Sequence, residues 1–159
     1  MLKEILSPES CQRCRTCCVF DRDDIWEIPV FSEEQQVRIA EKNPKYGFIP
    51  RGNGSWVYDM KFDADGLAAC PALSETGCTL CENKPFDCRI WPFRVMERNG
   101  DITLTLAPLC EAVNGLDSDT LSAFAKKLAP IVFAEADKNP DIIKPYAEGY
   151  KIYAVKARP

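Results

Sequence analysis

Nine cysteines are the residues of this chain whose type and spacing could do chemistry. Four of them form the run Cys11, Cys14, Cys17 and Cys18, and the others are Cys70, Cys78, Cys81, Cys88 and Cys110. Packing does not require such a density of thiols, because the reactivity of a cysteine usually decides why it is kept. The pattern therefore predicts a metal or cluster site, built from the N-terminal run and a central block of the chain.

Two kinds of thiolate site fit this number of cysteines. Iron–sulfur clusters are usually held by four thiolates each, so the chain could supply one or two clusters of the 4Fe-4S type. A structural zinc site is the alternative, and it would need thiolates alone or thiolates with carboxylates, because the chain has no histidine. The contiguous C-x2-C-x2-C run is typical of a cubane cluster. In addition, the C-x2-C pairs at Cys11 and Cys78 stand much further apart than the two knuckles of a zinc ribbon.

Basic residues are frequent beside the cysteines. They are Arg13, Arg15, Arg22, Lys84, Arg89 and Arg94. A cation close to a thiol lowers the pKa of that thiol and favours the thiolate that metals require. As a group, these residues would also offset the negative charge of a thiolate-ligated cluster.

The composition argues against nucleic acid and membranes as partners of this protein. The formal net charge is −4 and the sequence pI is about 5.0, so no broad basic face indicates nucleic acid. The apolar runs are too short for a membrane span, and the first ten residues lack the apolar core of a signal peptide. We therefore expect a cytoplasmic protein with a redox or protein partner that the sequence leaves unknown. Thiols stay reduced in that compartment, which favours metal binding over disulfides.

Helix and turn signals place the N-terminal cysteines. Ser7 or Ser10 would cap a helix that enters the cysteine run, and the run itself fits either a helix or a loop around a cluster. Cys17 and Cys18 are adjacent, so their side chains diverge and could serve different metal sites. The capping-box pattern from Ser32 to Gln35 predicts a short helix that ends at Asn43-Pro44.

The central and C-terminal parts favour hairpins and one longer helix. Residues 55–62 should form a strand, with 67–70 returning antiparallel to it, and Asn99-Gly100 should join a second hairpin. Asp117 should cap a helix that Pro130 kinks or divides, and a final strand should follow. These elements predict an α+β fold of short antiparallel hairpins and helices around the cysteine site. We expect a single domain over residues 1–159, with the C-terminal helix and strand within 117–156.

The cysteine pattern resembles a known family. The run from Cys11 to Cys18, the segment from Gly77 through Lys84-Pro85 to Cys88-Arg89, and the final Cys110 are similar to the CxxCxxCC (YkgJ-type) zinc- or iron-chelating domain family. The resemblance covers residues 11–110. It implies eight shared cysteines, namely Cys11, Cys14, Cys17, Cys18, Cys70, Cys78, Cys88 and Cys110. The chain has Cys81 where the family usually has tyrosine, which makes Cys81 an additional metal ligand or a redox-active thiol. It also has Lys84 where the family usually has arginine.

Several functions are compatible with such a site. We expect an iron–sulfur protein that acts in electron transfer or as a redox accessory protein. The alternatives are a structural zinc-binding module and a cluster-assisted protein-modifying enzyme, because the cysteine domain also resembles that of flagellin lysine N-methylases. No S-adenosylmethionine-binding motif is recognisable, and thiol–disulfide exchange lacks its usual βαβ surroundings. Catalytic residues are not identified from the sequence.

Overall fold

Local signals in the sequence determine many of the elements of this α+β fold. The computed structural model describes residues 2–157 and confirms the predicted class, with helices and mainly antiparallel strands. The backbone forms two compact units, Met1–Arg89 and Ile90–Pro159. Eight of the nine cysteines lie in the first unit, and Cys110 lies in the second.

Short elements make up the first unit. They are η1 (Leu2–Glu4), α1 (Pro8–Cys14), η2 (Thr16–Cys18), β1 (Val19–Asp21), η3 (Ile25–Glu27), β2 (Phe31–Ser32), α2 (Glu33–Lys42), β3 (Phe48–Gly52), β4 (Ser55–Tyr58), β5 (Leu67–Ala69), β6 (Leu73–Ser74), β7 (Gly77–Cys78), η4 (Cys81–Asn83) and α3 (Phe86–Ile90).

The cysteine run is neither one helix nor one loop. Ser7 caps α1, because its hydroxyl accepts a hydrogen bond from the Ser10 amide at 3.2 Å. The helix stops at Cys14, since Arg15 adopts a left-handed conformation with φ of 59°. A 3-10 turn, η2, then carries Cys17 and Cys18. The run is thus divided into a helical pair of cysteines and a second pair on the turn.

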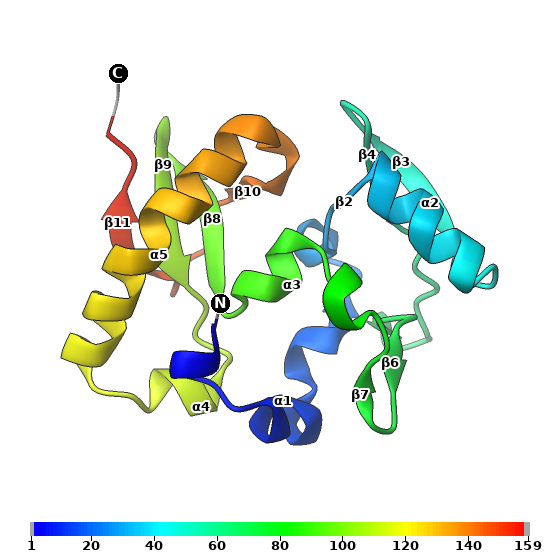
Figure 1. The fold of residues 1–159 in the computed structure, drawn as a ribbon, viewed down its shortest axis with the longest axis horizontal. Coiled ribbons are helices and arrows are strands. Elements are labelled where there is room, and N and C mark those ends of the chain that lie inside the picture. Colours follow the sequence, from blue (N-terminus) through cyan, green and yellow to red (C-terminus); the bar gives the residue numbers. More distant parts are fainter. Residues whose placement is uncertain (1, 158–159) are drawn as a thin grey trace. The chain divides into compact units, whose positions relative to one another are not determined.

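A three-stranded sheet holds the aromatic core of the first unit. Its order is β2-β4-β3, with Phe31 opposite Trp56 and Phe48 opposite Tyr58. The predicted capping box at Ser32 is present and begins α2, which lies beside this sheet (Figure 1). The sheet brings together the rings of Phe31, Phe48 and Tyr58, whose centroids are 4.8 to 5.3 Å apart.

The expected pairing of residues 67–70 with residues 55–62 is wrong. Strand β5 pairs antiparallel with β1, with Val19 opposite Ala69 and Asp21 opposite Leu67. Both edges of β4 are already paired, to β2 and to β3, so β4 has no free edge for β5. The Asp63 carboxylate accepts hydrogen bonds from the amides of Asp65 and Leu67 and so shapes the turn before β5.

The second unit packs a long helix on a four-stranded sheet. Its elements are β8 (Phe93–Arg98), β9 (Asp101–Leu106), α4 (Glu111–Asn114), α5 (Ser118–Lys138), η5 (Pro140–Ile142), β10 (Lys144–Pro145) and β11 (Lys151–Val155). The sheet order is β10-β8-β9-β11, and the predicted hairpin at Asn99-Gly100 joins β8 to β9. Asp117 caps α5 as predicted, and α5 runs across the sheet as one helix through Pro130 rather than dividing there (Figure 1). The buried stripe of α5, which includes Phe124, Leu128 and Val132, holds the helix on the sheet.

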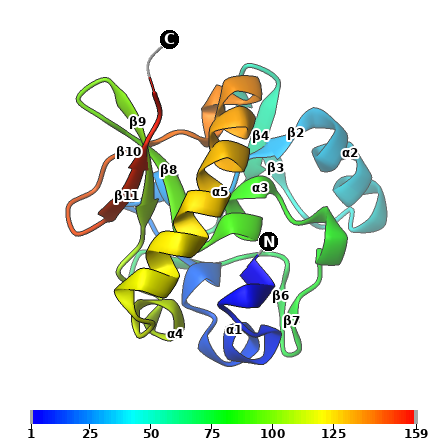
Figure 2. The same ribbon diagram turned by 60° about the vertical axis from the view of Figure 1, so that its left-hand side comes forward.

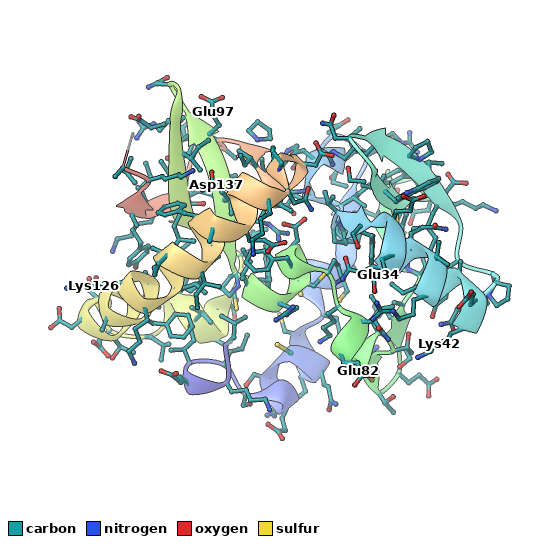
Figure 3. All side chains as sticks on the ribbon, turned by 45° about the horizontal axis from the view of Figure 1, so that its top comes forward. Glu34, Lys42, Glu82, Glu97, Lys126 and Asp137 are labelled. Carbon is teal, nitrogen blue, oxygen red and sulfur yellow. The ribbon has the colours of Figure 1, made fainter. Side chains whose placement is uncertain are left out.

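Charged side chains project from the surface of both units. Glu34 and Lys42 on α2 and Asp137 on α5 are exposed examples (Figure 3). Glu34 pairs with Arg38 one turn later, and Asp137 pairs with Lys156. Exposed pairs of this kind contribute little stability, typically below about 1 kcal/mol each. Among residues 2–157, no helix is both long and apolar enough to cross a bilayer.

Candidate functional site

The ribbon of β1 and β5 brings Cys18 and Cys70 together. Cys18 directly precedes β1 and Cys70 directly follows β5, so the two cysteines stand at the same end of the antiparallel pair. The Cys70 amide donates to the Cys18 carbonyl at 2.7 Å and extends the ladder by one bond. A pairing across about fifty residues of chain therefore places two of the predicted site residues side by side.

A close contact fixes α1 against the β6–β7 hairpin. The two elements lie side by side (Figure 2), and a Cβ built on Gly77 would stand 3.1 Å from Cγ of Gln12. The Arg15 guanidinium donates to the carbonyl of Gln12 at 3.1 Å and also to the carbonyl of Glu75. Arg15 thus ties the end of α1 to the hairpin whose second strand ends at Cys78.

The turn after β7 carries Cys78 and Cys81. The amide and the hydroxyl of Thr79 both donate to the Ala72 carbonyl, at 2.9 and 3.0 Å, which fixes the backbone between the two cysteines. Cys81 has a φ of 49°, a left-handed conformation that is uncommon for a residue other than glycine or asparagine. The thiols of Cys78 and Cys81 therefore come from one short C-x2-C segment.

Helix α3 supplies Cys88. The neighbouring Asp87 is 1% exposed, and its carboxylate accepts a hydrogen bond from the Val30 amide at 3.1 Å. This bond anchors α3 to the chain that enters β2. Cys88 is thereby held by a segment of the unit different from those that carry the other cysteines.

Seven cysteines of the first unit are linked by electrostatic interactions between their thiols. They are Cys11, Cys17, Cys18, Cys70, Cys78, Cys81 and Cys88. We assign these thiols to two groups, according to whether they interact with Cys17 or with Cys18, Cys70 and Cys78. Cys17 interacts with Cys11 and Cys88, which form the first thiol group with it.

Cys18 belongs to the second group of thiols. It interacts with Cys70 and Cys78, and Cys78 interacts in turn with Cys81. These four residues form the second thiol group. The hydrogen bond between Cys17 and Cys18 joins the two groups.

The Cys17–Cys18 pair is electrically asymmetric. Cys17 donates a hydrogen bond to the sulfur of Cys18, and this bond raises the pKa of Cys17 well above its usual value. The same bond lowers the pKa of Cys18 to about 7, with further lowering by Lys84 and Arg15 against the opposing effect of burial. Cys18 is therefore the thiol of this pair that ionises near neutral pH.

Burial governs two other thiols of the second group. Burial, with a smaller effect of nearby Cys18 and Cys78, raises the pKa of Cys70 to about 12 against the opposing effect of backbone hydrogen bonds from Ala72 and Leu73. Burial also raises the pKa of Cys78, while the Leu80 amide and Lys84 act in the opposite direction. Lys84 therefore interacts with two thiols of the second group. Of the other predicted cations, Arg22 donates to the Asp63 carbonyl at 3.0 Å instead.

None of the nine cysteines forms a disulfide bond, and their exposure to solvent differs. Cys11, Cys14 and Cys81 are exposed, five are half-buried, and Cys110 is buried. Within residues 2–157, no three cysteine or carboxylate side chains are grouped closely enough to hold a metal ion. The thiols thus converge on a common region of the first unit without forming a closed coordination site.

Two predicted ligands have other surroundings. The Cys14 thiol lies 3.1 Å from the Thr16 hydroxyl, and either group can donate the hydrogen bond. Cys110 is in the second unit at the start of α4, where its carbonyl accepts from the Asn114 side-chain amide at 2.9 Å. The electrostatic interactions between thiols that are described above do not include Cys14 or Cys110. They do include Cys81, which the family resemblance treats as an additional cysteine.

Sequence reasoning missed one residue of this region, Tyr58. Its phenol is buried beside Cys70, Cys78 and Cys88, and the pKa of Tyr58 is raised first by burial and then by these thiols. The only signal in the sequence was its place in a predicted strand, which does not indicate that the hydroxyl faces cysteines. No family model, no curated protein and no solved structure matches this chain, so the resemblance to the CxxCxxCC family stays a prediction.

Proposed function

We propose that the first unit binds iron–sulfur clusters of the 4Fe-4S type and that the protein acts in electron transfer or as a redox accessory protein. The observation that carries this proposal is that seven thiols from sequence-distant segments interact electrostatically with one another. Thiolates are the usual ligands of such clusters. The donor set is all sulfur, which selects soft or thiophilic metals over calcium or magnesium.

The two thiol groups support two clusters. The second thiol group, of Cys18, Cys70, Cys78 and Cys81, has the four thiols that one cluster requires. The first thiol group has Cys11, Cys17 and Cys88, and needs a fourth ligand. The family resemblance implies both Cys14 and Cys110 as ligands, and Cys14 on α1 lies in the same unit as the first thiol group. The adjacent Cys17 and Cys18 then serve different clusters.

The charges near the second thiol group favour cluster binding. Lys84 interacts with Cys18 and Cys78, and Arg15 interacts with Cys18. These cations stabilise thiolates and offset the negative charge that four thiolates bring to a cluster. The left-handed backbone at Cys81 is a costly conformation of the kind that is often kept at ligand-binding positions.

Cluster binding would also complete the arrangement of the site. The described thiols do not form a closed three-donor group, so side chains must rotate toward a common centre when a cluster enters. Metal sites often gain their final order on binding, since the binding free energy offsets the cost of ordering the ligands. We also propose a reducing compartment, the cytoplasm, because the cysteines form no disulfide bonds and thiols stay reduced there.

The test is anaerobic purification followed by analysis of iron, acid-labile sulfide and zinc, together with a visible absorption spectrum. We expect brown protein with about eight iron and eight sulfide ions per chain, which corresponds to two four-iron clusters. Reduction should then give an electron paramagnetic resonance signal. A Cys70→Ser variant should lose about half of the iron. Colourless protein without iron after anaerobic reconstitution would contradict the proposal.

A structural zinc site is the second candidate, and the turn from Cys78 to Cys81 favours it. Two thiols in a C-x2-C turn that follows a short hairpin are common at structural zinc sites. In that case the protein would be colourless and contain one or two zinc ions per chain. Removal of zinc with a chelator would lower the stability of the first unit.

A further inference from the structure

The buried hydroxyl of Tyr58 lacks a hydrogen-bond partner. Tyr58 ends β4 and is 1% exposed. Within residues 2–157, its hydroxyl oxygen has no donor or acceptor at hydrogen-bonding distance. Buried polar atoms nearly always have a partner in folded proteins, because an unsatisfied one keeps the full cost of desolvation. The missing partner of the Tyr58 hydroxyl is therefore to be sought in a bound group.

Neighbouring aromatic rings hold the Tyr58 ring in place. Its centroid lies 4.8 Å from those of Phe31 and Phe48, and 6.0 Å from that of Tyr46. Phe48 is also the direct cross-strand partner of Tyr58 in the β3–β4 pairing. A ring packed on several sides cannot swing its hydroxyl into solvent without breaking the core of the sheet. The hydroxyl must therefore find its partner where it is.

Cysteines are among the groups that interact with the Tyr58 phenol. Electrostatic interactions link it to Cys70 and Cys78 of the second thiol group, then to Tyr46, and more weakly to Cys88 of the first thiol group. A tyrosine phenol is protonated at neutral pH, so the buried hydroxyl of Tyr58 is an O–H donor that the described part of its own chain leaves without an acceptor. A thiolate that carries metal charge is a far better acceptor than the neutral thiols of the metal-free chain.

Tyr46 provides a built-in comparison. It is a second buried tyrosine, 8% exposed, and its ring packs edge-on against that of Tyr58. Its hydroxyl lies 3.1 Å from the Thr79 hydroxyl, which also reaches the Ala72 carbonyl at 3.0 Å. The two tyrosines thus share one aromatic cluster and differ in whether the hydroxyl has a protein partner.

We propose that Tyr58 donates its hydroxyl hydrogen to a cluster-bound thiolate of the second thiol group, Cys70 or Cys78, and thereby sets the reduction potential of that cluster. This inference rests on the function proposed above. Reduction adds an electron and makes the cluster more negative, and a hydrogen bond to a ligating sulfur stabilises that added charge. Tyr58 is accordingly a positioning and tuning residue and not a ligand.

The experiment compares Tyr58→Phe and Tyr46→Phe with the unsubstituted chain after anaerobic reconstitution with iron and sulfide. We expect all three proteins to take up equal iron. In Tyr58→Phe, the equilibrium constant for reduction of one cluster should fall about tenfold, which is a midpoint potential lower by about 59 mV for one electron. The other cluster should keep its potential, as should both clusters of Tyr46→Phe.

The melting temperatures of the metal-free proteins give a second readout, in which Tyr46→Phe and not Tyr58→Phe is the affected variant. Tyr58→Phe removes an unsatisfied hydroxyl and should melt at the same temperature as the unsubstituted chain or higher. Tyr46→Phe removes a hydroxyl that has a partner and should melt lower. Site-specific replacement of Tyr58 by 3-fluorotyrosine, a stronger donor, should raise the potential that Tyr58→Phe lowers.

The failures of the two proposals are distinguishable. Loaded Tyr58→Phe protein with an unchanged potential for every cluster overturns the role of Tyr58 and leaves the iron–sulfur function standing. Equal lowering in Tyr58→Phe and Tyr46→Phe also overturns it, because the effect would then come from the aromatic core. An unsubstituted chain that takes up no iron and sulfide overturns the proposed function and this inference together.

Discussion

At the scale of single residues, the difference between Cys17 and Cys18 arises from their immediate surroundings. The two cysteines are adjacent in sequence, yet one donates the hydrogen bond that the other accepts. Lys84 and Arg15 then favour the thiolate at Cys18. Neighbouring residues in a 3-10 turn point in different directions, so one thiol reaches cations that the other does not.

We predict that Cys18 is alkylated first in the metal-free protein. Thiolates and not thiols react with iodoacetamide, so the rate at Cys18 should reach half of its maximum at pH about 7. Cys70, whose pKa is raised to about 12, should stay unreactive at pH 8. Peptide mass spectrometry of the alkylated protein across pH 6 to 9 measures both.

Lys84→Met should move the midpoint for Cys18 to higher pH, because it removes a cation that stabilises the thiolate. Lys42→Met on the surface of α2 is the matched control and should leave the midpoint in place. The lowered pKa also has a stability consequence. The Cys18 thiolate contributes stability above the usual thiol pKa, and that contribution is lost as the pH falls through about 7. A uniform alkylation rate at all nine cysteines would contradict this prediction.

At the scale of elements, the docking of α1 on the β6–β7 hairpin positions the N-terminal cysteines against the central ones. The approach is close enough that a Cβ at Gly77 would stand 3.1 Å from Gln12, and Gly77 also has a φ of 111°. The backbone conformation favours glycine at this position, and a Cβ there would in addition force the Gln12 side chain to shift. The hairpin, in turn, ends in Cys78.

We predict that Gly77→Ala lowers the free energy of unfolding by about 2 kcal/mol, because it adds a steric contact to backbone strain. Gly54→Ala is the matched control. Gly54 also has a positive φ, of 75°, but a Cβ there meets no atom within 4 Å. Its cost should be about 1 kcal/mol, from strain alone. Urea denaturation of both metal-free variants gives the difference, and equal losses would show that the contact with Gln12 contributes nothing.

Local elements could be predicted from the sequence, and long-range pairings could not. The Ser32 capping box, the Asp117 cap and the Asn99-Gly100 hairpin are each specified by residues within a few positions of one another. The pairing of β5 with β1 depends instead on which strand edges remain free once β4 has paired on both sides. That is a property of the folded unit, and it is the pairing that places Cys70 beside Cys18.

The residues of the candidate site could likewise be predicted from local sequence, whereas their arrangement could not. The cysteines were recognisable as candidate ligands from their number and spacing. Their partition into two thiol groups follows from the three-dimensional arrangement, as does the burial of the Tyr58 hydroxyl among them. A strand pattern fixes which face of a sheet a tyrosine occupies, but not which side chains from other elements meet its hydroxyl.

At the scale of the whole molecule, the cysteines are concentrated in one of the two units. Eight lie within Met1–Arg89, a number that suffices for two four-thiolate clusters. The second unit has its own core, in which α5 packs on the four-stranded sheet. Its one cysteine is Cys110. We therefore expect cluster loading to stabilise the first unit directly through the ligands that it orders.

The partition into two thiol groups predicts that Cys17→Ser and Cys18→Ser each remove a different cluster. Each variant should keep about half of the iron, since a cluster held by three thiolates is lost on purification while the other retains its full set. Electron paramagnetic resonance of the two reduced variants should show two different signals, and their sum should reproduce the spectrum of the unsubstituted chain. Cys81→Ser should give the same signal as Cys18→Ser, because both residues belong to the second thiol group.

Two further variants identify the fourth ligand of the first thiol group. Whichever of Cys14→Ser and Cys110→Ser matches the signal of Cys17→Ser removes that ligand, and the other should retain all of its iron. Identical partial losses in Cys17→Ser and Cys18→Ser would contradict the two-cluster arrangement. The two adjacent cysteines would then belong to a single site, and the seven linked thiols would serve one cluster with three to spare.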